Sequence, residues 1–179
     1  MEQNNVILIV DMINDFVTGK FGNKNALNAA NRAADVLKYN KMPVVFARDF
    51  HIKNDPEFRV WGEHALMNTP ASEIYEKLKK YPDFIINKRH YDAFHDTDLD
   101  SLLRFLNAKK LYLFGISTDI CVMHTASGAF YRNYDVTVVS DLCASIDENN
   151  HEDALKKIKI NYGYNSIDSE EFKGVIKNE

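Results

Sequence analysis

Cys121 is the residue of this chain best suited to covalent chemistry. It follows a short apolar run, 111–114, that resembles a buried strand, and it opens a helix-like run, 121–131. A cysteine at a helix N-terminus faces unpaired amides and the positive end of the helix dipole, which lower a thiol pKa and can hold an oxyanion. We therefore expect a nucleophile, although Cys121 alone also fits a small buried core residue.

Two further residues suit acyl transfer by a thiol. Such a thiol needs a group that accepts its proton and passes it to the leaving amine, and Asp11, after the first apolar run, is the candidate. Lys88, after the third run, could stabilise both thiolate and carboxylate. The amides of Ser117 and Cys121 are candidates for an oxyanion hole. Taken singly, Asp11 also fits a turn cap and Lys88 a solvated surface lysine.

A polar loop holds Asp49, His51, Glu57, Glu63 and His64 within sixteen residues. Two imidazoles with carboxylates between them suit zinc or a similar divalent ion that keeps open positions for water or substrate. The spacing fits equally a polar loop whose histidines contact solvent or cap helices.

Aromatic residues and a second cysteine fall near the same segments. Phe16, Trp61, Tyr91 and Phe94 could form an aromatic slot, or could pack at its rim as aromatic residues do in many folds. Cys143 is assigned to the core or to the surroundings of the site.

Short apolar runs alternate with helical patterns along the chain. Strands are expected at 6–10, 44–47, 84–86, 111–114, 136–139 and 164–167, and helices at 26–38, 72–79, 98–106, 121–131 and 151–160. Continuously apolar strands that alternate with helices indicate a three-layer α/β/α, Rossmann-like fold with a mostly parallel central sheet. Ligands of such sheets bind at the carboxyl ends of the strands, where the candidate residues fall.

Composition limits the classes of function. With 179 residues and 45% hydrophobic content, the chain suits a single domain, 1–179. Its net charge of −4 gives no basic field for nucleic acid. The longest apolar run is too short to span a membrane, and the first five residues lack the pattern of a signal peptide. We expect a cytoplasmic protein with free thiols.

These motifs together resemble the isochorismatase-like cysteine hydrolases, most closely the nicotinamidase (pyrazinamidase/nicotinamidase) branch. The matching segments are 10–16, 49–51, 56–57 with Trp61 and His64, 88–94, 97–99 and 115–126. The resemblance runs from about Val6 to Ile167 and implies the isochorismatase-like hydrolase fold.

The resemblance implies roles for the candidate residues. Asp11, Lys88 and Cys121 would form the catalytic triad, with Asp11 as proton shuttle and Cys121 as nucleophile. A cis peptide between Ile116 and Ser117 would turn the Ser117 amide into the oxyanion hole. This arrangement would hydrolyse an amide through a thioester.

The resemblance also implies a metal and a substrate pocket. One divalent ion, zinc in the first instance and otherwise iron or manganese, would bind the ring nitrogen of the substrate. The ligands it implies are Asp49, His51, Glu57 and His64, and the aromatic residues against the substrate are Phe16, Trp61 and Tyr91. Glu63 is a departure from the pattern, because its carboxylate could alter the metal site or the charge of the pocket.

The leading expectation is a cysteine amidohydrolase that converts nicotinamide to nicotinate and ammonia, in NAD salvage. The alternative enzyme is an N-carbamoylsarcosine amidase or a related carbamoyl amide hydrolase of the same superfamily. The non-enzymatic alternative is a catalytically silent member of the superfamily that binds a small ligand. Family members often associate, so a homo-oligomer is also considered.

Overall fold

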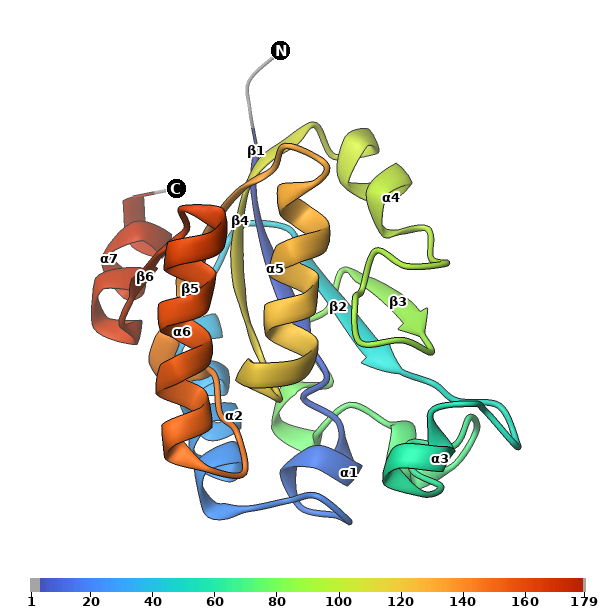
Figure 1. The fold of residues 1–179 in the computed structure, drawn as a ribbon. Helices are drawn as coiled ribbons and strands as arrows, with labels where there is room; N and C mark the ends of the chain where they lie inside the picture. Colours follow the sequence, from blue (N-terminus) through green and yellow to red (C-terminus); the bar gives the residue numbers. More distant parts are fainter. Residues whose placement is uncertain (1–3, 179) are drawn as a thin grey trace.

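The computed structural model describes residues 4–178, and residues 1–3 and 179 lie outside it. The expectation that the first five residues form no signal peptide therefore falls partly outside the described residues. Six parallel strands form one sheet in the order β3-β2-β1-β4-β5-β6 (Figure 1). The strands are β1 (Asn4–Val10), β2 (Val44–Asp49), β3 (Phe84–Lys88), β4 (Ala108–Gly115), β5 (Asp135–Val139) and β6 (Asn165–Ile167). This is the predicted Rossmann-like architecture, with every strand pair parallel.

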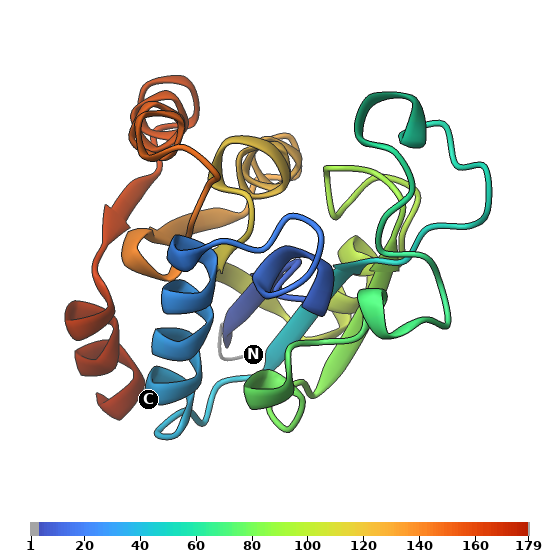
Figure 2. The same ribbon diagram turned by 90° about the horizontal axis from the view of Figure 1, so that it is seen from below.

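Helices cover both faces of the sheet. They are α1 (Asn14–Val17), α2 (Lys24–Leu37), α3 (Phe58–Trp61), α4 (Leu99–Phe105), α5 (Met123–Phe130), α6 (Glu148–Tyr162) and α7 (Ser169–Asn178). Helices α5 and α6 lie on one face, and α2 and α7 on the other (Figure 2). Within residues 4–178, no helix combines the length and the apolar character needed to cross a bilayer.

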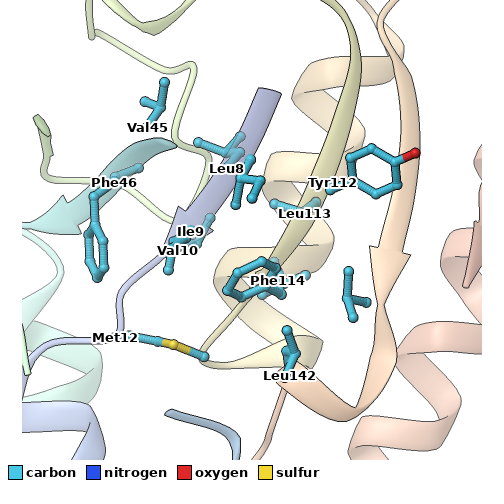
Figure 3. Packing of buried hydrophobic residues seen from close by; sticks show 14 of the residues in the cluster. Leu8, Ile9, Val10, Met12, Val45, Phe46, Tyr112, Leu113, Phe114 and Leu142 are labelled. Carbon is cyan, nitrogen blue, oxygen red and sulfur yellow. The ribbon is translucent and has the colours of Figure 1, made fainter. Parts of the chain in front are cut away.

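The four inner strands, β1, β2, β4 and β5, are apolar without alternation because both of their faces are buried, whereas the edge strands β3 and β6 are partly exposed. Every residue from Val6 to Val10 is inaccessible to solvent. Figure 3 shows Leu8, Val10 and Phe114 within the packed interior of the sheet and its helices. Burial on both faces gives such strands the continuous hydrophobic pattern that made them predictable.

The helix predicted at 72–79 is wrong. Two separate 3-10 turns, Pro70–Ser72 and Glu76–Leu78, occupy this region. The residues between them are extended, because Ile74 forms an antiparallel bridge with Ile13 and the Tyr75 amide donates to the Met12 carbonyl at 3.0 Å. Tertiary pairing thus replaces the local helical preference.

Three helices were not predicted. Helix α7 buries Phe172 and Ile176 completely, but the rest of its sequence is too polar and too close to the chain end to indicate a packed helix. Helices α1 and α3 are four residues each, too short to show a helical period.

Candidate active site

Four candidate residues meet where the first four strands end. Asp11 directly follows β1, and Asp49 and Lys88 are the last residues of β2 and β3. Cys121 lies in the turn that follows β4. The chain crosses from one side of β1 to the other between β3 and β4, which makes this edge the switch point where parallel α/β sheets bind ligands. Figure 2 views the molecule from this end.

The backbone at the end of β1 directs the Asp11 carboxylate into the site. Asp11 has a φ of 54°, in the left-handed region that aspartate tolerates better than most residues. Its amide donates to the Ala47 carbonyl at 2.8 Å, and its Oδ1 accepts from the Asp49 amide at 2.6 Å. Both the backbone and the carboxylate of Asp11 are therefore fixed to β2.

Gly115 permits β4 to pass against the end of β1. It has a φ of 147°, and a Cβ at this position would lie 1.9 Å from the Val10 carbonyl oxygen. Only glycine fits here, and the turn that carries Cys121 begins immediately afterwards.

Lys88 is the centre of the buried charges. Its Nζ lies 2.6 Å from Asp11 Oδ2, 2.5 Å from Asp49 Oδ1 and 3.8 Å from Cys121 Sγ, and it also donates to the His90 carbonyl at 3.1 Å. Burial by itself would lower the pKa of the Lys88 ammonium, but the carboxylates of Asp11 and Asp49 hold that pKa well above its usual value. Lys88 is therefore a buried cation, and the alternative of a solvated surface lysine is wrong.

Cys121 is less ready to ionise than the sequence suggested. It lies on a π-helical turn, Thr118–Val122, and α5 begins only after it. Burial raises the pKa of its thiol well above the usual value, although the Lys88 ammonium opposes this effect. The expectation of a thiol pKa lowered by a helix N-terminus is thus wrong for this resting state, because desolvation outweighs the favourable charges.

Asp11 has the properties of a proton acceptor for this thiol. Burial, reinforced by the charge of Asp49, raises the pKa of Asp11 to about 7 despite the neighbouring Lys88 ammonium. A carboxylate oxygen of Asp11 lies within 4.8 Å of Cys121 Sγ. A general base works best when its pKa is close to the working pH.

The turn between Gly115 and Cys121 carries the peptide whose amide was expected to bind an oxyanion. The peptide bond between Ile116 and Ser117 is cis. The following residue is fixed from two sides, since the Thr118 amide donates to the Ala144 carbonyl at 3.0 Å and Thr118 Oγ1 lies 2.8 Å from His151 Nδ1. The loop after β5 and helix α6 therefore hold this turn in place.

Asp49, His51, Glu57 and His64 form a compact cluster beside these residues. One potential ligand atom from each lies within 4.8 Å of the others. His51 Nε2 is 3.5 Å from Asp49 Oδ2, and His64 Nε2 is 3.5 Å from Glu57 Oε1. Ligand atoms about 2.1 Å from a tetrahedral ion are about 3.4 Å apart, so the spacing suits a divalent metal.

The histidines are oriented for a metal. His51 Nδ1 lies 3.2 Å from Asp55 Oδ2, and His64 Nδ1 lies 2.8 Å from the Gly62 carbonyl, which leaves each Nε2 directed at the cluster. His51 Nε2 is buried and makes no hydrogen bond within residues 4–178. A buried ring nitrogen that makes no hydrogen bond is costly unless a ligand completes it, so these residues fit a metal.

Glu63 does not join this cluster. It is exposed, and its backbone carbonyl accepts from Lys20 Nζ at 2.9 Å. Glu57 is the glutamate that lies with the two histidines.

A small pocket opens onto Cys121. Phe16, Trp61 and Tyr91 line it as expected, and Trp61 Nε1 donates to the Tyr91 hydroxyl at 2.9 Å. The centre of a water molecule can occupy a volume of about 50 Å³ inside it. Phe94, also considered for this wall, is instead buried and stacked on Tyr134.

Sequence reasoning missed several residues around the pocket. Phe21 lines it and packs edge-on against both Trp61 and His64, and Ile146 reaches it from the loop after β5. Neither carries a polar group that would have singled it out. Asp55 could have been noticed, because it lies four residues after His51 in the same polar loop.

Cys143 is not among the residues that line this pocket. It is buried, its thiol lies 3.4 Å from the Val139 carbonyl, and burial raises its pKa to about 12. It is a core residue, one of the two roles considered for it.

Comparison with known proteins agrees with this geometry. The model of the isochorismatase domain matches residues 5–171. The chain belongs to the isochorismatase family. The resemblance inferred from its motifs is thereby confirmed. Nicotinamidase 3 of Arabidopsis thaliana is 28% identical over 166 residues, which cover 88% of this chain and 82% of that protein.

Two solved structures of this family share the fold. N-carbamoylsarcosine amidase from Thermoplasma acidophilum is 32% identical with a TM-score of 0.84, covering 93% of this chain and 97% of that one. Pyrazinamidase of Pyrococcus horikoshii, solved in complex with zinc, is 27% identical with a TM-score of 0.83, covering 92% and 99% of the two chains. This member of the family is therefore an α/β hydrolase whose relatives act on small amides.

Proposed function

We propose that this protein is a cysteine amidohydrolase that converts nicotinamide to nicotinate and ammonia. The observation that carries the proposal is the position of Lys88, whose ammonium contacts Asp11 and Asp49 and lies 3.8 Å from the Cys121 thiol. One buried cation thus joins a nucleophile, a proton acceptor and a metal-ligand cluster beside a single small pocket.

In the first half of the reaction, Asp11 takes the proton of the Cys121 thiol as the sulfur attacks the amide carbon. The Lys88 ammonium stabilises the thiolate that forms. The amides of Ser117 and Cys121 bind the oxyanion of the tetrahedral intermediate. Asp11 then passes its proton to the leaving nitrogen, so that ammonia departs and a thioester to Cys121 remains.

In the second half, Asp11 acts on a water molecule. Its carboxylate, free again after ammonia leaves, accepts a proton from the water that attacks the thioester carbon. The same amides bind the second oxyanion. Collapse of this intermediate breaks the carbon–sulfur bond, and the proton returns to the sulfur as nicotinate is released.

Asp49, His51, Glu57 and His64 would hold the metal, for which zinc is the first candidate. When bound, the ion supplies a Lewis-acidic point that can hold a ring nitrogen and so orient the carboxamide toward Cys121. Asp55 and the Gly62 carbonyl keep the two imidazoles directed at this position.

The pocket favours a substrate of about one aromatic ring. The centre of a water molecule can occupy about 50 Å³ of this pocket. One water needs roughly 10–15 Å³ on the same measure, so the pocket is only a few times larger. Phe16, Phe21 and Trp61 offer ring surfaces to a flat aromatic ligand.

Hydrolysis of N-carbamoylsarcosine or a related carbamoyl amide is the second candidate. It is favoured by the 32% identity with the Thermoplasma acidophilum amidase, which exceeds the 27% identity with the Pyrococcus horikoshii pyrazinamidase. A carbamoyl substrate has no ring nitrogen, so it would leave the metal cluster without a role in substrate binding.

Ammonia release from the two compounds tests the proposal. The purified protein is assayed with nicotinamide and with N-carbamoylsarcosine, after chelation and again after zinc or manganese is added back. We expect release from nicotinamide that falls on chelation and returns with metal, and none with Cys121→Ala. Release from N-carbamoylsarcosine alone, insensitive to chelation, would overturn the assignment in favour of the second candidate.

A further inference from the structure

A second group of metal-ligand side chains lies outside the candidate active site. It consists of His90, His95 and Asp96, in the loop between β3 and α4, and one ligand atom from each lies within 4.8 Å of the others. Their side chains are 40%, 58% and 72% exposed, in contrast to the buried cluster around His51. The mechanism proposed above uses none of these three side chains.

A single carboxylate oxygen faces both imidazoles. Asp96 Oδ2 lies 3.8 Å from His90 Nε2 and 3.5 Å from His95 Nε2, and the two rings meet edge to face with centroids 4.5 Å apart. These separations are close to the roughly 3.4 Å expected between ligand atoms of a tetrahedral ion. All three ligand atoms lie within 4.8 Å of one another, a spacing at which one ion could contact all of them.

The backbone of this loop is held in the required shape without a metal. The Ala93 amide donates to Thr125 Oγ1 at 3.0 Å, the Thr97 hydroxyl donates to the Ala93 carbonyl at 2.6 Å, and Phe94 is buried in the core. Asp96 has a φ of 52°, in the left-handed region that aspartate tolerates better than most residues. Because the backbone is already fixed, less conformational entropy is lost when a metal binds.

We propose that His90, His95 and Asp96 form a second, solvent-accessible site for a divalent transition-metal ion such as zinc. Two imidazoles and one carboxylate are borderline ligands that suit zinc, copper, cobalt or nickel better than calcium or magnesium. With three protein ligands, the ion keeps at least one position for water. Exposure to solvent makes this site exchange its ion faster and bind it more weakly than the buried cluster.

Metal titration tests the proposal. The protein is stripped of metal by chelation, and zinc is added in competition with a chromophoric chelator. We expect two equivalents, one tight and one weaker. The variants His90→Ala and His95→Ala should each weaken the second equivalent about tenfold or more, which corresponds to at least about 1.4 kcal/mol, and should retain the first. Retention of the tight equivalent also shows that these variants are folded.

Two matched variants locate the equivalents. His51→Ala should lose the tight equivalent and keep the weak one. His124→Ala, which removes an exposed histidine outside both clusters, should keep both. The proposal would be overturned if the wild-type protein bound only one equivalent. It would also be overturned if the second equivalent survived in the His90→Ala, His95→Ala double variant, or if it disappeared with His124→Ala. These outcomes do not depend on which amide the enzyme cleaves.

Discussion

The Nζ of Lys88 and Oδ1 of Asp49 lie 2.5 Å apart, which joins the residues around the thiol to the metal-ligand cluster. The other oxygen of Asp49 lies 3.5 Å from His51 Nε2. One carboxylate therefore faces both groups, and its loss should affect both. Removal of a ligand that does not contact Lys88 should affect the metal alone.

We predict that Asp49→Asn and His64→Ala differ in their kinetics. Both variants should bind less metal. His64→Ala should mainly raise KM and recover with excess metal, whereas Asp49→Asn should keep a kcat at least about 100-fold lower at saturating metal and substrate, because Lys88 has lost a partner. Metal content and steady-state kinetics provide the measurement. Equal recovery of the two variants would show that Asp49 acts only as a ligand.

Metal removal should lower thermal stability. An ion that binds the folded protein and not the unfolded chain stabilises the folded state by mass action, so chelation should lower Tm. His51→Ala should abolish most of this shift, and His95→Ala should preserve it, because the buried cluster binds more tightly. Calorimetry with and without chelator gives the values. A wild-type Tm that does not change on chelation would argue against a buried metal.

Tyr91→Phe should weaken substrate binding by a modest factor. The substitution removes the hydroxyl that accepts from Trp61 Nε1 at 2.9 Å and leaves the indole free to turn. A hydrogen bond of about 1 kcal/mol corresponds to about a fivefold rise in KM, with kcat little changed. Tyr131→Phe, at an exposed position, is the control. A large fall in kcat with KM unchanged would contradict a role in binding alone.

Gly115→Ala should be strongly destabilising. The added Cβ would meet the Val10 carbonyl oxygen at 1.9 Å, at a φ of 147° that side chains rarely adopt. We expect the free energy of unfolding to fall by several kcal/mol, on the order of 4 or more. Gly174→Ala, in an open position of α7, should instead gain up to about 1 kcal/mol. Urea denaturation measures both, and a neutral Gly115→Ala would show that the strands can separate at this point.

The inner strands could be predicted because burial on both faces gives each of them a continuous apolar run. The candidate site followed from the predicted strands, since Asp11, Asp49 and Lys88 stand where three of them end. The segment 73–75 could not be predicted, because its extended form depends on the pairing of Ile74 with Ile13, 61 residues away in the sequence. A local pattern carries no information about such a partner.

The environment of the site was harder to predict than its residues. The raised pKa of Cys121 depends on how closely other elements cover the thiol, which no motif reports. Phe21 and Ile146 line the pocket through position alone, as apolar residues on loops. The extent of the domain, 1–179, and the catalytic roles remain predictions.

Acid quenching of the reaction tests the central claim most directly. The enzyme is mixed with nicotinamide, stopped in acid within the first turnovers, and analysed by intact mass and peptide mapping. We predict a nicotinoyl thioester on Cys121, present also in Cys143→Ala, whose substituted thiol belongs to the core, and absent from Cys121→Ala. Full turnover with no acyl group on Cys121 at any time, or with unchanged rate in Cys121→Ala, would contradict the account.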